Sequence, residues 1–311
     1  MKRDLFRYII RKNRMIILSI SISVLIVSNI KGQDNKSPNE KYFTLGCLRN
    51  TISDVDINDA SAAIKVWGQK IEERLKLGVT FDFMLFNDIN DLIKYPQKDN
   101  LGFVVLNTID YLKNKSKLQV YPASTPPDCV EYLLLVKKDK YKNLADLKGK
   151  KLGLAISNNN PIPGMWIDVL LGKKKLDRKE KFFGSLKEFN KESQLILSVF
   201  FEQNDVCVAS SSAFKTMCEL NPQVERNLII LAVSPCYTIG LACMTQNSRK
   251  FNYIDKLIDA TGDMDSFPEG KQILTLMKTL RVRRFKRDDL KTVEDLLKEY
   301  EILQNKKIAS E

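Results

Sequence analysis

The sequence predicts an α/β protein in which two sets of alternating strands and helices follow one another along the chain. Short apolar runs rich in Val, Ile, Leu and Phe are typical of buried strands. Between two such runs, Ala60, Ile64, Trp67 and Ile71 recur at helical spacing. The alternation favours mainly parallel sheets covered by helices. At 311 residues and 44% hydrophobic content, the chain can form one large or two medium domains with real cores.

The first set begins where a polar stretch ends. We expect its strands and helices, in chain order, at 42–48, 58–77, 81–86, 88–95, 101–106 and 108–112. Strand, helix, strand, helix, strand is the order of a parallel sheet with covering helices.

The second set follows Pro122, Pro126 and Pro127. Its expected strands are 130–136, 151–156, 205–209 and 228–233, and its expected helices are about 163–171, 191–202 and 211–220. A strand at 240–244 and helices at 251–260, 269–279 and 288–303 then close the chain. The apolar stripe of the last helix predicts packing on a core, with a charged coiled tail as the alternative.

The N-terminus has the composition of an export signal. Residues 1–14 are basic, Met15–Val27 is apolar, and small and polar residues follow. We therefore expect 1–32 to be a signal peptide or membrane anchor and 33–41 a tether. The apolar run is short for a spanning helix, but no Ala-x-Ala cleavage site is present, so an uncleaved anchor stays open. The expected location is periplasmic, either free or anchored to the inner membrane.

Charge and residue usage exclude several function classes. The chain has a formal net charge of +12, but seven Lys/Arg and one acid lie in 1–32. The rest of the chain therefore carries a net charge of +6. This modest charge favours a solvated surface over a nucleic-acid face. Histidine is absent, which excludes a Ser-His-Asp device and the commonest metal ligand. None of the six cysteines forms a Cys-x-x-Cys motif. We expect no metal, no cofactor and no enzymatic activity.

The cysteines have two interpretations. Cys207 and Cys243 lie in apolar runs, where buried free thiols are expected. In an oxidising compartment one or two disulfides can form, but the sequence does not pair them.

Several segments carry a family resemblance. They are Asn143–Gly153 (NLADLKGKKLG), Gly102–Asn107 with Tyr111, Phe183–Ser185 and Leu231–Pro235. In this order, over roughly 40–300, they resemble the phosphonate/phosphite-type periplasmic solute-binding proteins of ABC importers. The resemblance implies a two-lobed type 2 periplasmic-binding fold with two hinge crossings and closure on the ligand. The implied lobes are 42–130 with 236–311, and 131–235.

Most candidate ligand residues follow the ends of strands, where helix N-termini can hold an anion. The candidates are Arg49, Asn50, Thr51, Asn107, Tyr111, Asn158, Asn159, Asn160, Ser185, Asp205 and Ser210. Ser185 and Asp205 are instead implied by the family resemblance, and Asp205 can equally end a turn before its strand. Asn158–Asn160 match the family's Ser-Thr-Ser triplet, but Pro161 replaces its glycine, and Leu186 stands where the family has a histidine. Structural alternatives remain: Arg49 as a solvated side chain, Tyr111 as a core aromatic, the asparagines as turn formers and Ser210 as a plain N-cap.

The expected function is capture of a small polar ligand, a phosphonate- or phosphate-like oxyanion, for an ABC permease in the inner membrane. We expect a monomer that binds no nucleic acid. The alternative is a membrane-tethered ligand sensor that signals rather than transports. An enzyme on the same fold, such as a pyrimidine-synthesising relative, would need a histidine or a cysteine-rich motif, and neither is visible.

Overall fold

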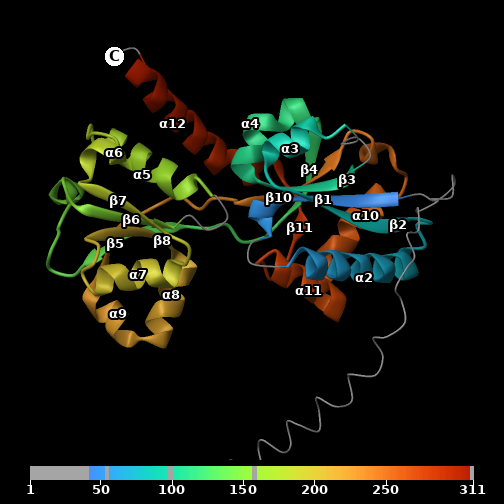
Figure 1. The fold of residues 1–311 in the computed structure, drawn as a ribbon, viewed down its shortest axis with the longest axis horizontal. Helices are drawn as coiled ribbons and strands as arrows, with labels where there is room; N and C mark the ends of the chain where they lie inside the picture. Colours follow the sequence, from blue (N-terminus) through green and yellow to red (C-terminus); the bar gives the residue numbers. More distant parts are fainter. Residues whose placement is uncertain (1–41, 53–55, 97–100, 156–159, 309–311) are drawn as a thin grey trace, which may run out of the picture. The chain divides into compact units, whose positions relative to one another are not determined.

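The computed structural model describes residues 42–308 apart from 53–55, 97–100 and 156–159. The expected signal segment 1–32 and tether 33–41 lie outside these residues. In the part of the chain that is described, no helix combines the length and the hydrophobicity needed to cross a membrane. The described strands form two sheets, one of six strands and one of five (Figure 1).

The first sheet has the strand order β2-β1-β3-β10-β4-β11. The strands β1, β2 and β3 are parallel, while β10 runs antiparallel to both β3 and β4. The short β11 pairs antiparallel with β4 at one edge. Their bounds are β1 Tyr42–Leu48, β2 Thr80–Phe86, β3 Leu101–Asn107, β4 Val120–Thr125, β10 Gly240–Thr245 and β11 Arg283–Arg284.

The second sheet repeats this plan with the order β7-β6-β8-β5-β9. Its first three strands, β6, β7 and β8, are parallel, and β5 is inserted antiparallel between β8 and β9. In both sheets the inserted strand is the one that the chain forms on arriving from the other sheet. The bounds are β5 Tyr132–Lys137, β6 Lys151–Ala155, β7 Ser185–Phe189, β8 Val206–Ser210 and β9 Leu228–Val233.

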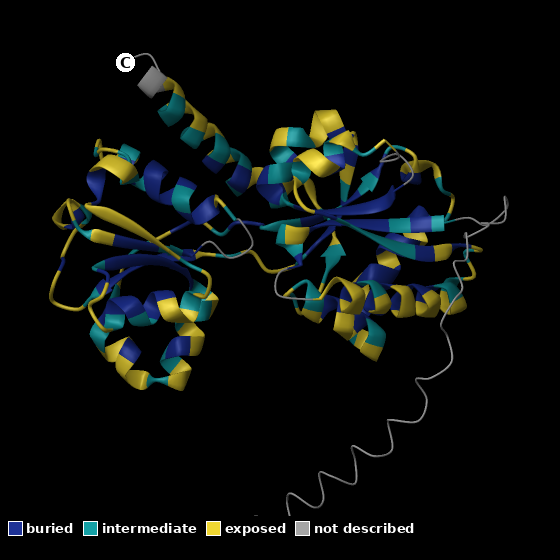
Figure 2. Ribbon diagram, viewed as in Figure 1, coloured by how far each residue is buried: buried dark blue, intermediate teal, exposed yellow. Residues whose placement is uncertain are grey.

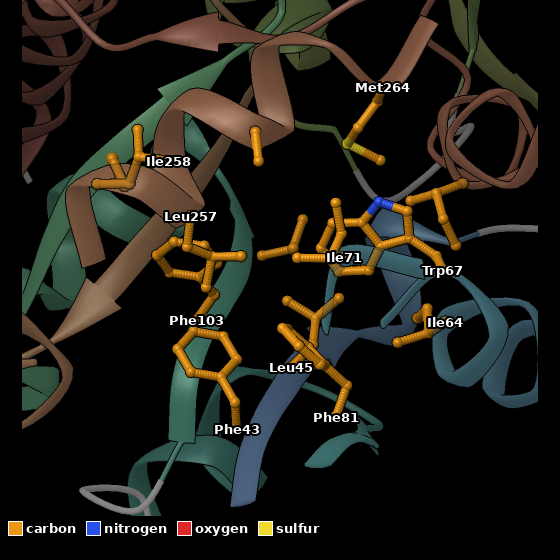
Figure 3. Packing of buried hydrophobic residues seen from close by; sticks show 14 of the residues in the cluster. Phe43, Leu45, Ile64, Trp67, Ile71, Phe81, Phe103, Leu257, Ile258 and Met264 are labelled. Atoms are coloured by element: carbon orange, nitrogen blue, oxygen red, sulfur yellow. The ribbon is translucent and has the colours of Figure 1, made fainter. Parts of the chain in front are cut away.

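Helices cover both faces of the first sheet (Figure 1). On one face, α2 (Ile57–Leu75), α10 (Ile254–Gly262) and α11 (Pro268–Leu276) enclose an apolar cluster around Phe43, Trp67 and Phe81 (Figure 3). A Cβ at Gly68 would lie 2.2 Å from the Cβ of Phe81, so glycine is needed where α2 meets β2. On the other face, α3 (Ile89–Lys94) and α4 (Thr108–Leu118) pack on a second cluster that includes Leu48 and Leu106.

Helices also cover both faces of the second sheet. On one face lie α5 (Ile162–Lys173) and α6 (Lys179–Phe182); on the other lie α7 (Glu192–Phe200), α8 (Ser211–Leu220) and α9 (Pro222–Asn227). The central strands β5 and β8 are almost wholly buried, which Figure 2 shows in dark blue. All residues of the four apolar clusters lie between Phe43 and Leu303, so residues 41–311 contain the whole described core.

The chain passes between the sheets through residues 126–131 and 234–239. Val130 and Tyr237 exchange both backbone hydrogen bonds there, at 2.8 and 2.9 Å. Beside this bridge, Cys129 and Cys236 form a disulfide, which supplies the pairing that the sequence left open. Cys207 and Cys243 are buried free thiols, as expected.

The last helix, α12 (Lys291–Ile308), packs on a core, as its apolar stripe predicts. Val293 and Leu296 join the cluster under α5, and the Lys173 ammonium pairs with Glu299 at 2.8 Å. Near its start, the Thr292 hydroxyl donates to the Cys236 carbonyl at 2.7 Å. This helix therefore contacts one crossing segment and the second sheet's helices. The exact lobe boundaries stay a prediction.

Most expected elements are present within a few residues of their predicted bounds, but β4, β7, β11, α6 and α9 were not predicted. Every residue of β7 is at least partly exposed, because β7 is an edge strand with little covering it. Such a strand lacks the apolar alternation that marks a strand in a sequence.

Candidate functional site

The first group of site residues lies at the carboxyl edge of the first sheet. Asn107 ends β3 and caps α4: its Oδ1 accepts from the Asp110 N–H at 2.7 Å, and its Nδ2 donates to Asp110 Oδ2 at 2.6 Å. Asn50, just past β1, donates to the same Oδ2 at 3.4 Å. Asp110, which sequence reasoning missed, therefore joins two predicted residues.

This group is rich in hydrogen-bond acceptors. Burial raises the pKa of Asp110, although the hydrogen bonds from Asn50 and Asn107 oppose that shift. The Asn50 Oδ1 and Thr108 Oγ1 atoms are buried without a hydrogen-bond partner among the described residues. Since an unpaired buried polar atom is costly, each can gain from a ligand group that donates an N–H or O–H.

Arg49 and Thr51 flank Asn50 in the short 3-10 helix η1 (Arg49–Thr51). Arg49 is exposed, and its Nε–H donates to Asn87 Oδ1 at 3.4 Å, just past the carboxyl end of β2. The Thr51 hydroxyl instead donates to the Leu48 carbonyl at 2.7 Å and closes the turn. Arg49 is thus the one cation among the predicted site residues at this edge.

Tyr111 lies in the apolar core between the first sheet and the helices α3 and α4. It is only 7% exposed and belongs to the cluster with Leu48 and Phe86. Burial raises the pKa of its phenol to about 12. This position agrees with its alternative interpretation as a core aromatic on a helix.

The second group lies at the carboxyl edge of the second sheet. Ser210 ends β8 and caps α8, where its Oγ accepts from the Ala213 N–H at 3.2 Å. The Glu192 carboxylate, at the start of α7, accepts from both the Ser210 N–H and the Ser210 Oγ at 2.7 Å. Glu192 was also missed by sequence reasoning. It places a negative charge next to a predicted ligand residue.

Asn160 and Tyr132 complete this edge. The Asn160 Nδ2 donates to the Tyr132 hydroxyl at 2.7 Å, and its Oδ1 accepts from the Ile162 N–H at the start of α5. Tyr132 begins β5, pairs with Ser210 in the ladder, and donates its backbone N–H to Ser234 Oγ at 2.8 Å. Burial, together with the charge of Glu192, raises the pKa of the Tyr132 phenol. Asn158 and Asn159 lie outside the described residues.

Ser185 and Asp205 lie at the opposite, amino-terminal edge of the second sheet. Ser185 is the first residue of β7 and pairs with Lys151, the first residue of β6. Asp205 directly precedes β8, where its carboxylate accepts from the Tyr141 hydroxyl at 2.5 Å and the Lys151 N–H at 3.0 Å. The structure does not bring these two residues together with Asn160 and Ser210.

The two sheets have the same plan. In each, one antiparallel strand, β10 or β5, lies between three parallel strands and a fourth strand, β4 or β9, that is parallel to those three. This plan defines the two-lobed type 2 periplasmic-binding fold. In such α/β sheets, ligands bind at the carboxyl ends of the strands. Among the described residues, no group of three or more Cys, Asp or Glu side chains is placed to hold a metal ion.

The family is shown by a match over residues 51–290 to the model "ABC transporter, phosphonate, periplasmic substrate-binding protein". The chain belongs to this family, whose members bind substrates and are not enzymes. Membership implies export, a small-molecule ligand and an ABC permease partner. No curated protein sequence matches the chain.

Solved structures share the fold at low sequence identity. A binding protein component of an ABC phosphonate transporter from Pseudomonas aeruginosa is 16% identical with a TM-score of 0.55, covering 85% of this chain and 87% of that one. A Xanthomonas citri protein bound to chloride ion is 14% identical with a TM-score of 0.60 (86% and 99%). PhnD1 from Prochlorococcus marinus in complex with methylphosphonate is 12% identical with a TM-score of 0.56 (82% and 97%).

Proposed function

We propose that this protein reversibly captures a small polar solute with a phosphonate- or phosphate-like oxyanion and delivers it to an ABC permease. The observation that carries the proposal is the position of Asn160 and Ser210. Both lie at the starts of helices, α5 and α8, on the carboxyl edge of the second sheet. Helix N-termini favour anions because their free N–H groups and positive dipole ends point at the ligand.

The carboxylates near these residues restrict which ligands can bind, because they accept hydrogen bonds and repel anions. Glu192 already occupies the N–H and hydroxyl of Ser210, so it competes with an oxyanion there. At the first sheet, Asn50 and Asp110 offer acceptors rather than donors. These features favour a ligand that carries N–H or O–H donors in addition to its anionic group.

We further propose that the lobes are 42–130 with 236–311, and 131–235, and that they close on the ligand about the crossings at 126–131 and 234–239. Closure would combine the two carboxyl edges into one site. Ligand binding would then shift the population toward the closed form that the permease recognises.

A thermal-shift screen of the purified protein tests the ligand class. Phosphate, phosphite, alkylphosphonates and sulfonates should be tested, each beside an amino- or hydroxyl-substituted analogue. A specific ligand at a hundred times its dissociation constant stabilises the folded state by about 2.7 kcal/mol. If no oxyanion raises the unfolding midpoint, the proposed ligand class is wrong.

A tethered sensor is the second candidate. It is favoured by the run Met15–Val27, which no Ala-x-Ala cleavage site follows. Mass spectrometry of the protein from membranes discriminates between the two: a retained residue 1 supports the tether, and a new N-terminus near residue 33 supports a released transport protein.

A further inference from the structure

Lysines gather at the amino-terminal edge of the second sheet, the edge opposite Asn160 and Ser210. We call this group the lysine edge, and it consists of Lys140, Lys142, Lys148, Lys150, Lys151 and Lys181. All are exposed except Lys150, which is half-buried with its ammonium 5.8 Å from the Tyr141 ring centre. None of them belongs to the candidate ligand site.

Backbone hydrogen bonds hold the segments of the lysine edge side by side. The Gly149 N–H donates to the Phe182 carbonyl at 2.8 Å, and the Gly184 N–H donates to the Lys150 carbonyl at 2.9 Å. A Cβ at Gly184 would lie 2.4 Å from the Gly149 carbonyl oxygen, so the two loops touch. The start of β6 is thereby fixed against the end of α6, which carries Lys181.

Two acids within this edge, Asp146 and Asp205, accept hydrogen bonds from the backbone, while Glu202 pairs with the Lys140 ammonium at 3.1 Å. Asp146 accepts from the backbone N–H groups of Lys142 and Asn143 at 2.8 and 3.1 Å. Asp205 accepts from Tyr141 and the Lys151 N–H. Of the six lysine ammonium groups, only that of Lys140 lies within 4.0 Å of a carboxylate of the described residues. The other five have no carboxylate of the described residues within that distance, although the charges of Lys142 and Lys150 help to lower the pKa of Asp146 and of Asp205.

The composition of the edge distinguishes between kinds of partner. Its large apolar residues Tyr141, Leu147, Phe182 and Phe183 are buried and Leu144 is half-buried. Two apolar side chains at its margin, Leu186 and Phe201, are exposed, but they lie singly and on different segments. Stable protein–protein interfaces depend on aromatic or apolar anchors at their centre. Lysine is a point charge that lacks the planar fork with which arginine recognises one carboxylate or phosphate in a fixed geometry. The edge therefore fits a diffuse, extended negative surface.

We propose that the lysine edge binds the surface of an anionic phospholipid membrane. Clustered lysines are attracted to anionic headgroups within about a Debye length of the membrane. The ligand site lies at the other edge of the same sheet, so this contact leaves Asn160 and Ser210 uncovered. The expected apolar segment at the N-terminus would bring the chain to such a surface.

Vesicle co-sedimentation tests this proposal with residues 41–311, which contain the described core but not the N-terminal apolar run. Vesicles of phosphatidylcholine alone are compared with vesicles that also contain phosphatidylglycerol. The test variant combines Lys142→Gln, Lys148→Gln and Lys181→Gln. The matched control combines Lys117→Gln, Lys256→Gln and Lys271→Gln, which are exposed lysines on helices of the first sheet. Unfolding midpoints confirm that each variant is folded.

We expect binding only to vesicles with phosphatidylglycerol, and loss of that binding at high salt. Each lysine removed from the edge should lower the partition coefficient roughly fivefold, so the test variant should bind about a hundredfold more weakly, while the control changes little. The proposal is overturned if the two variants lose binding equally, because net charge alone would then be responsible. Failure of the unmutated protein to bind anionic vesicles at low salt also overturns it and leaves an acidic protein surface as the candidate partner.

Discussion

Cys129 and Cys236 form a disulfide that joins the two segments through which the chain passes between its sheets. The two cysteines are 107 residues apart in the sequence, and the whole second sheet lies between them. The backbone bridge of Val130 and Tyr237 lies directly beside the bond. The disulfide and the bridge therefore hold the two crossings together at one place.

Replacing this disulfide with Cys129→Ser and Cys236→Ser should destabilise the fold. A cross-link that closes a loop of this length removes much conformational entropy from the unfolded chain, so the expected loss is about 2–5 kcal/mol. Urea denaturation followed by circular dichroism measures it. The control is Cys218→Ser, which alters a half-buried free thiol and should change stability little. Equal stability of the double variant and the unmutated protein would show that the bond does not contribute.

Asp168 on α5 should be essential for stability, because it holds together the helices α5 and α6 that cover one face of the second sheet. Its side chain is fully buried and pairs with the Lys179 ammonium at 2.7 Å and with Arg178 at 3.3 Å. Asp168→Asn removes the fully buried counter-charge and leaves these cations only the half-exposed Glu180 carboxylate, which should cost about 3–5 kcal/mol of unfolding free energy. The comparison variant, Glu180→Gln, removes a half-exposed partner of Lys179 and should cost less than about 1 kcal/mol. Similar losses for both variants would contradict this explanation.

Asp205 should stabilise the fold without affecting ligand affinity, because it lies at the amino-terminal edge. Burial opposes its ionisation, but hydrogen bonds from Tyr141 and the Lys151 N–H outweigh it and hold the pKa below the usual range. Its contribution is therefore present above the unfolded pKa of about 4 and is lost as the pH falls through the lower folded value. Asp205→Asn should cost about 1–3 kcal/mol at pH 7.

Denaturation of Asp205→Asn and of the unmutated protein at several pH values checks this prediction. The difference in unfolding free energy should shrink below about pH 4. A calorimetric titration of both proteins with the same ligand should give equal dissociation constants. A large loss of affinity in the variant would return Asp205 to the ligand site.

The double variant Asn158→Ala with Asn160→Ala should abolish ligand binding and keep a cooperative unfolding transition. Asn160 links the start of α5 to the Tyr132 hydroxyl, so its loss removes both a donor and the orientation of that hydroxyl. The matched control is Asn221→Ala with Asn227→Ala, at the ends of α9. Unchanged affinity of the first variant in a calorimetric titration would exclude this loop from the site.

Much of the candidate site could be predicted because Asn107 and Ser210 end, and Asn50 closely follows, strands whose apolar runs are visible in the sequence. Tyr132 and Glu192 could not be predicted as part of the candidate site. Tyr132 reaches this edge because β5 is inserted antiparallel, and Glu192 reaches it because it follows the unpredicted strand β7. The missed β7 also explains the position of Ser185. The sequence places Gly184 and Ser185 shortly before a predicted helix, but Ser185 in fact begins the strand β7, which precedes that helix. Edge strands that bury little leave the weakest pattern in a sequence.

Small-angle X-ray scattering with and without the ligand tests the central proposal most directly. The compound that raises the unfolding midpoint in the thermal-shift screen should be added at saturating concentration. If the two lobes close around it, the radius of gyration should decrease, and it should not decrease for the double variant Asn158→Ala with Asn160→Ala. An identical scattering profile with and without a ligand that binds would contradict the proposed capture by closure.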